Sequence, residues 1–348
     1  MKQTVITKAL RRIAPNKKPQ NTTERLILFR TMRNIFGRVS VNRFPYFVSA
    51  LKNMGHRQFM HGDVGKFYKM RNRLVFKNFF YERDLYEMIK ADLEEMHPVH
   101  KGIRLALSRN GVMVYDNYRN RQFNTLLLTN HAGTWVPKIF EEKMQLTKMD
   151  RLREEDLDSD KIYSNLVLEK GGIWINSKLS RFVCDYNRSQ RGCIYFQDRE
   201  KWLKKRLWKE SFTQSEINRI HSWHSEYYNV LFKVLETYRF NIVYDGHTMK
   251  DKPGRPMMSF GTRYVPSFYM PIVKKLRGRL LGMGYSPIYL NKPYEGGFVL
   301  RWLSSMYPYK FIFSMEINKR LYTNKSRTRS QKGKLNKIKG DITGLFEI

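Results

Sequence analysis

Alternating apolar and polar stretches predict a chain of short strands and helices. Apolar runs at residues 112–115, 126–129, 173–176, 181–185, 240–244 and 311–317 have the length and content of buried strands. Apolar positions at helical spacing predict helices at 25–36, 81–96 and 215–238. Because strands alternate with helices, the pattern favours an α/β fold with a mixed sheet.

Both ends of the chain are basic. Residues 1–20 carry no acidic side chain, which is typical of a flexible basic arm and also compatible with an organelle transit peptide. We expect residues 21–120 to form a basic, mostly helical region that packs on the catalytic domain or precedes it. We expect residues 323–348 to form a flexible basic tail. The helix at 25–36 has apolar and arginine-bearing faces, so it could also lie on a membrane surface.

The formal net charge of +34 is the strongest compositional signal. Such a field attracts polyanions, and cations interleave with aromatics at 43–47, 66–69 and 77–81, as on surfaces that bind single-stranded nucleic acid. One hypothesis is therefore a binding scaffold for nucleic acid or a ribonucleoprotein. The alternatives are a core stripe with a solvated basic rim, and a cellular background that favours basic proteins.

The apolar runs and the cysteines limit where in the cell the protein is expected to be found. No run is long enough to predict a transmembrane helix. Cys184 and Cys193 are too few for a disulfide scaffold and lack the CxxC spacing of a zinc site, so a reducing, cytoplasmic setting is the default expectation.

Histidines and carboxylates at or near predicted strand ends are the candidate metal ligands and general base. His131 and His247 each follow an apolar strand and sit beside a small residue that would leave room for an ion. A third metal ligand could come from the acidic cluster at 156–160, and Glu316 interrupts an apolar strand, where burial would suit a general base. The alternative is that each histidine is a hydrogen-bonded core residue and Glu316 pairs with an arginine.

Eight short blocks occur in an order that one known family shares. They are residues 130–137 (Asn-His-Ala-Gly-Thr-Trp-Val-Pro), 156–163 (Asp-Leu-Asp-Ser-Asp-Lys-Ile-Tyr), 180–188 (Ser-Arg-Phe-Val-Cys-Asp-Tyr-Asn-Arg), 223–224 (Trp-His), 245–248 (Asp-Gly-His-Thr), 260–262 (Phe-Gly-Thr), 291–301 and 314–317 (Ser-Met-Glu-Ile). With these blocks the chain resembles the N-formylglutamate amidohydrolase family, relatives of zinc carboxypeptidases. The resemblance implies a catalytic domain at 121–322 with a three-layer α/β/α fold of the zinc-peptidase, phosphorylase and hydrolase type.

The resemblance also implies a site with one Zn²⁺ ion. His131, Asp156 and His247 match the metal ligands, with Asp158 or Asp160 as alternates in another register. Glu316 matches the glutamate that activates the zinc-bound water in the related carboxypeptidases. The remaining matches are Asn187, Arg188 and Arg301 as substrate-binding residues and His224 as a group that polarises the developing oxyanion.

Departures from the family pattern concern the substrate side. The lysine before Gly-Gly is Glu295 here, the proline before His131 is Asn130, and the serine after His247 is Thr248. The expected function is therefore water attack on an amide carbonyl of an acidic or N-acylated amino acid or peptide, with the substrate left open.

Overall fold

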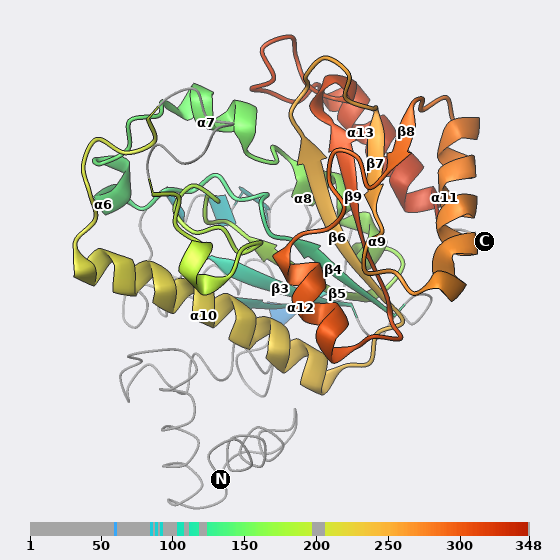
Figure 1. Ribbon diagram of the computed structural model, residues 1–348, viewed down its shortest axis with the longest axis horizontal. Helices are drawn as coiled ribbons and strands as arrows, with labels where there is room; N and C mark the ends of the chain where they lie inside the picture. Colours follow the sequence, from blue (N-terminus) through green and yellow to red (C-terminus); the bar gives the residue numbers. More distant parts are fainter. Residues whose placement is uncertain are drawn as a thin grey trace, which may run out of the picture. The chain divides into compact units, whose positions relative to one another are not determined.

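The chain divides into two compact units, which are described separately. Figure 1 labels the helices and strands. The first comprises Met1–Asn117 and Phe212–Arg239, and the second Tyr118–Ser211 and Phe240–Ile348. The computed structural model describes residues 59–60, 84–85, 88–89, 91–92, 103–107, 111–117, 124–196 and 206–346. The predicted arm at 1–20, the helix at 25–36 and the basic aromatic segments at 43–47, 66–69 and 77–81 lie outside these ranges.

Among its described residues, the first unit has three antiparallel strands and a long helix. Strands β1 (Phe59–Met60), β2 (Arg104–Leu107) and β3 (Val112–Asn117) pair in that order. Helix α10 (Gln214–Thr237) begins with a capping box between Thr213 and Glu216, and its buried apolar side chains recur at helical spacing, as predicted. The described positions within 81–96 are helical as well. Contacts group α10 with the N-terminal part of the chain, and the predicted 121–322 domain stays a prediction.

The second unit is built on a mixed sheet in the order β5-β4-β6-β9-β7-β8. Neighbouring strands run parallel except β7 and β9, which are antiparallel. This confirms the predicted α/β class with a mixed sheet. The strands are β4 (Thr125–Thr129), β5 (Gly172–Ser177), β6 (Ile242–Met249), β7 (Met258–Gly261), β8 (Ile288–Leu290) and β9 (Phe311–Asn318).

Helices cover both faces of this sheet. On one face, Tyr244 of β6 contacts Tyr163 of α8 and Phe346 beyond α13. Because side chains alternate along a strand, Asp245 and His247 lie on the other face, toward the start of α12. The helices of this unit are α6 (Lys138–Glu141), α7 (Lys148–Glu154), α8 (Ser159–Tyr163), α9 (Asn165–Leu168), α11 (Met270–Gly282), α12 (Phe298–Met306) and α13 (Lys332–Gly344).

Three sequence expectations differ from the structure. Residues 181–185 form turns rather than a strand, because the Ser180 hydroxyl and carbonyl accept hydrogen bonds from the backbone of Phe182 and Cys184. The segment 323–348 was expected to be flexible, yet it contains α13, whose Ile338 and Ile342 are buried one turn apart. His247 lies inside β6 rather than just past it, since that strand continues to Met249.

No helix in the described ranges combines the length and the apolar character that crossing a membrane requires.

Candidate metal centre and pocket

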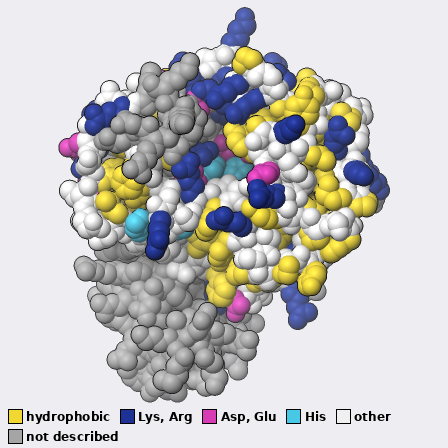
Figure 2. Space-filling view, in the orientation of Figure 1, with side chains coloured by type: hydrophobic (Ala, Val, Ile, Leu, Met, Phe, Trp, Pro, Cys, Tyr) yellow, Lys and Arg dark blue, Asp and Glu magenta, His cyan; other side chains and the backbone are white. Residues whose placement is uncertain are grey.

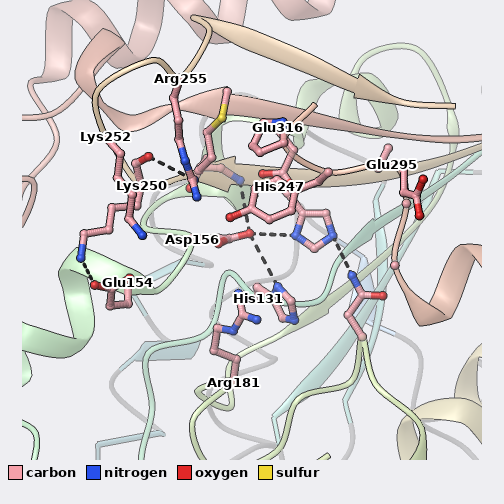
Figure 3. Close-up of a pocket in the computed structure, with 18 of the residues that line it drawn as sticks. His131, Glu154, Asp156, Arg181, His247, Lys250, Lys252, Arg255, Glu295 and Glu316 are labelled. Carbon is pink, nitrogen blue, oxygen red and sulfur yellow. Dashed lines mark hydrogen bonds and ion pairs between the residues drawn. The ribbon is translucent and has the colours of Figure 1, made fainter. Parts of the chain in front are cut away.

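Two histidines and one aspartate meet at the carboxyl ends of the central strands. His131 follows β4, Asp156 lies between α7 and α8, and His247 lies in β6. Oδ2 of Asp156 is 2.8 Å from Nδ1 of His247 and 3.8 Å from Nδ1 of His131, and one donor atom from each residue lies within 4.8 Å of the others (Figure 3). The structure thus brings together the three side chains that the sequence motifs selected.

The alternates to Asp156 face elsewhere. Ser330 donates a hydrogen bond of 2.5 Å to Asp158. Asp160 pairs with Lys178 at 2.8 Å and accepts a hydrogen bond from Asn176. Neither carboxylate belongs to the His131–Asp156–His247 group.

Backbone and side-chain contacts hold Asp156 in place. Its backbone N–H donates to the His131 carbonyl at 3.3 Å, and its carboxylate accepts from the Thr248 N–H at 3.2 Å. Just before it, α7 ends against the buried Lys319, whose ammonium donates to the carbonyls of Leu152 and Arg153. The position of Asp156 is therefore set by β4, β6 and the segment after β9 together.

Each histidine is oriented from behind by a further aspartate. Nε2 of His131 is 2.6 Å from Asp185, and Nε2 of His247 is 2.9 Å from Asp245. Both rings therefore present Nδ1 to the centre. A carboxylate that holds the outer nitrogen in this way fixes the tautomer and orientation of a metal-binding histidine.

Sequence reasoning missed the roles of these two aspartates, although both stood in quoted motifs. Asp245 precedes His247 by two residues, so the two side chains share one face of β6. That spacing could have identified it. Asp185 is far from His131 in sequence and lies in a turn, so no local pattern pointed to the pair.

The electrostatics of the centre suit a cation. Burial and the nearby Arg181 lower the pKa of His131, which keeps its ring neutral. For His247, burial lowers the pKa, but Asp245 and Asp156 outweigh it and raise the pKa well above its usual value. Burial would raise the pKa of Asp185, but His131 and Arg181 hold it well below its ordinary range. The carboxylates thus favour positive charge between the rings.

Glu316 lies beside His247 because β6 and β9 are parallel neighbours. The two residues are paired in register, so their side chains leave the sheet on the same face. Burial raises the pKa of Glu316 to about 8, with the His247 ring opposing the shift and Asp156 adding to it. A carboxyl group with this pKa can exchange a proton near neutral pH.

The donor set fits a divalent transition metal. Zinc takes imidazole nitrogens and carboxylate oxygens, usually three protein ligands in catalytic sites. Here the two Nδ1 atoms and the Asp156 oxygen converge, and both outer ring nitrogens have carboxylate partners. We conclude that His131, Asp156 and His247 can hold such an ion.

The centre lies in a pocket of about 530 Å³. Figure 2 shows histidine and acidic side chains in a hollow, with lysine and arginine side chains around it. The pocket is lined by His131, Glu154, Asp156, Arg181, Asn187, Arg188, His247, Thr248, Met249, Lys250, Lys252, Arg255, Pro293, Tyr294, Glu295, Gly296, Gly297, Ser314 and Glu316.

Only some of the predicted substrate-binding residues line the pocket. Arg188 lines the pocket, with its guanidinium 3.7 Å from Asp185 and 4.3 Å from the centroid of the Tyr195 ring. Asn187 also lines it, 3.3 Å from the His247 ring. Arg301 is exposed on α12 over Phe298 and is not among the lining residues. His224 belongs to α10 of the first unit, so its predicted role stays a prediction.

One detail corrects the sequence analysis, and one adds to it. Gly246 does not make room for an ion, since a Cβ there would meet the Tyr163 ring at 2.4 Å. Tyr163 in turn donates hydrogen bonds to the carbonyls of His247 and Met315. Glu295, the charge reversal near Gly-Gly, forms an ion pair with Arg263.

The chain is similar to known proteins in sequence and in fold. Residues 123–323, more than half of the chain, match the family model of N-formylglutamate amidohydrolase. Among solved structures, N-formylglutamate amidohydrolase from Ralstonia eutropha superposes with a TM-score of 0.53 at 20% identity, covering 64% of this chain and 91% of that one. A gene product from Agrobacterium tumefaciens gives a TM-score of 0.54 at 14% identity, covering 68% and 93%. No curated protein sequence matches.

Proposed function

Because the chain belongs to the N-formylglutamate amidohydrolase family, we propose that it is a metal-dependent hydrolase of amide bonds with His131, Asp156 and His247 as the ligands. The observation that carries the proposal is the convergence of three donor atoms on one point, with both histidines oriented by aspartates. Zinc fits this donor set of two imidazole nitrogens and one carboxylate oxygen.

A bound zinc ion supplies a Lewis acid that polarises a carbonyl group and lowers the pKa of water. Glu316 removes a proton from the attacking water, whose oxygen bonds to the amide carbon. When the C–N bond breaks, Glu316 returns the proton to the leaving nitrogen, which gives a carboxylic acid and an amine. The acid then loses the second water proton and the amine gains one, so the products are a carboxylate and an ammonium group. The pairing of Glu316 with His247 in the β6–β9 register, and its position in the pocket lining, support both roles.

Arg188 is the residue that we assign to substrate binding. It lines the pocket and offers a planar fork that can grip a carboxylate through two parallel hydrogen bonds. The Asn187 side chain contacts His247 and accepts the backbone N–H of Val299, so we assign it the positioning of His247 and α12. Roles for Arg301 and His224, and the nucleic-acid scaffold that net charge suggests, stay predictions without support from the pocket.

The proposed base is tested with Glu316→Gln in the zinc-loaded protein, using a panel of N-acyl amino acids. Hydrolysis should fall by roughly 100-fold or more, because the group that moves the proton is lost. Zinc content should be unchanged. Glu210→Gln, at an exposed carboxylate, is the matched control and should retain full activity. A Glu316 variant as active as the parent would remove Glu316 from the mechanism.

A further inference from the structure

Two cations line the pocket without a carboxylate partner. Within the described part of the chain, no ion pair includes Lys252 or Arg255, although both line the pocket. The neighbouring Asp251 could have neutralised them, but it faces Arg327 at 2.6 Å and Arg320 at 3.9 Å.

Three other cations of the pocket each have a carboxylate of the protein within 4 Å. Arg181 and Arg188 share Asp185. Lys250 forms an ion pair with Glu154. Among the described lysines and arginines that line the pocket, Lys252 and Arg255 are therefore the two that form no ion pair.

The loop between β6 and β7 holds Arg255 in a defined orientation. Its backbone N–H donates to the Lys252 carbonyl at 3.1 Å, and its guanidinium donates to the Lys250 carbonyl at 3.2 Å. The guanidinium carbon lies 5.2 Å from the centroid of the Tyr294 ring. An arginine fixed on an aromatic ring loses little freedom when it binds an anion.

Arg188 and the two cations come from segments that flank β4 and β6, the strands associated with the two histidines, on opposite sides in the strand order. Arg188 lines the pocket from the segment after β5, the strand that neighbours β4 on the side away from β6. Lys252 and Arg255 come from the β6–β7 loop, which passes over β9. Figure 3 shows them on one side of the Asp156–His247 pair, with Glu295 on the other.

We propose that Lys252 and Arg255 form an anion-binding subsite for the acyl part of the substrate. The substrate class is then an N-acyl amino acid with an anionic group on each side of the scissile amide: the amino-acid carboxylate at Arg188, and a carboxylate or phosphate on the acyl chain at Lys252 and Arg255. This inference rests on the proposed function for its placement of the scissile bond.

The test measures binding by isothermal titration calorimetry to the full zinc-loaded chain carrying Glu316→Gln, which prevents turnover. N-succinyl-L-alanine and N-butyryl-L-alanine have acyl chains of the same length and differ in a terminal carboxylate. The succinyl compound should bind at least about 10-fold more tightly, as expected for charge-assisted hydrogen bonds. N-(3-phosphonopropionyl)-L-alanine tells whether the subsite prefers phosphate-like or carboxylate oxygen.

Lys252→Gln/Arg255→Gln, added to that background, should reduce the succinyl preference to below about threefold and leave the affinity for the butyryl compound unchanged. Lys274→Gln/Lys275→Gln is the matched control. It removes the same net charge from exposed positions on α11, so the preference should persist.

Three results would overturn the subsite: equal affinity for the succinyl and butyryl compounds, no binding of either anionic compound, or a preference that survives loss of both cations. Failure of the proposed function is a separate result. The preference for the succinyl compound can depend on Lys252 and Arg255 even if the zinc-loaded protein with Glu316 intact hydrolyses none of the three compounds and no member of the N-acyl amino-acid panel. In that case the subsite would stand and the hydrolase assignment would be wrong.

Discussion

At the scale of single residues, the centre depends on which nitrogen of each histidine faces inward. Asp185 and Asp245 occupy the Nε2 atoms of His131 and His247, which leaves both Nδ1 atoms for the ion. The histidines could be selected from motifs because each stands in a short, ordered block. Their aspartate partners could not be paired from sequence alone, since a turn brings Asp185 to His131.

Glu316 should make the metal-free protein less stable as pH rises. Its folded pKa is about 8 against an ordinary 4.5, so between these values the folded state holds a proton that the unfolded state has lost. Stability therefore falls as pH rises through this window and levels off above it. Glu316→Gln should remove that loss.

Thermal unfolding of the zinc-free protein from pH 5 to pH 9 measures this effect. The variant should be equal to the parent near pH 5 and more stable by up to a few kcal/mol at pH 9, since one pKa unit corresponds to about 1.4 kcal/mol. Parallel pH profiles for the two proteins would show that Glu316 is not buried as described.

At the scale of elements, the register between β6 and β9 decides the chemistry. His247 and Glu316 are directly paired, which places ligand and base side by side on one face of the sheet. Apolar patterning predicted both strands, but it did not predict their register or that β6 continues through His247. Because glycine is common in turns, Gly246 suggested that the strand ends there. In the structure Gly246 lies inside β6, where the close contact with the Tyr163 ring leaves no room for a Cβ atom.

Gly246→Ala tests this contact. The added Cβ would meet the Tyr163 ring at 2.4 Å, and the ring is held by hydrogen bonds to the His247 and Met315 carbonyls. We expect a loss of about 1–3 kcal/mol of unfolding free energy and weaker zinc binding. Gly278→Ala on α11, where a Cβ meets nothing within 4 Å, should instead stabilise by about 0.5–1 kcal/mol. Unfolding in urea compares the two, and a neutral Gly246 variant would contradict the packing.

At the scale of the whole molecule, the family domain and the compact units divide the chain differently. The family match runs continuously over 123–323, but α10 inside it groups with the N-terminal part of the chain. Linear patterns cannot show such grouping, because it depends on contacts between distant segments. The buried α13 was also missed, since a few well-spaced apolar residues in a basic segment give a weak signal. The fold class, in contrast, followed from the alternation of strands and helices.

Metal content with and without His247 is the most direct test of the central claim. After loading with zinc and gel filtration, elemental analysis should find roughly one ion per chain, as expected for three converging protein ligands. His247→Ala should lose the ion, while His221→Ala, on α10 outside the pocket, should keep it. Zinc absent from the parent protein, or retained in full by the His247 variant, would contradict a metal centre at His131, Asp156 and His247.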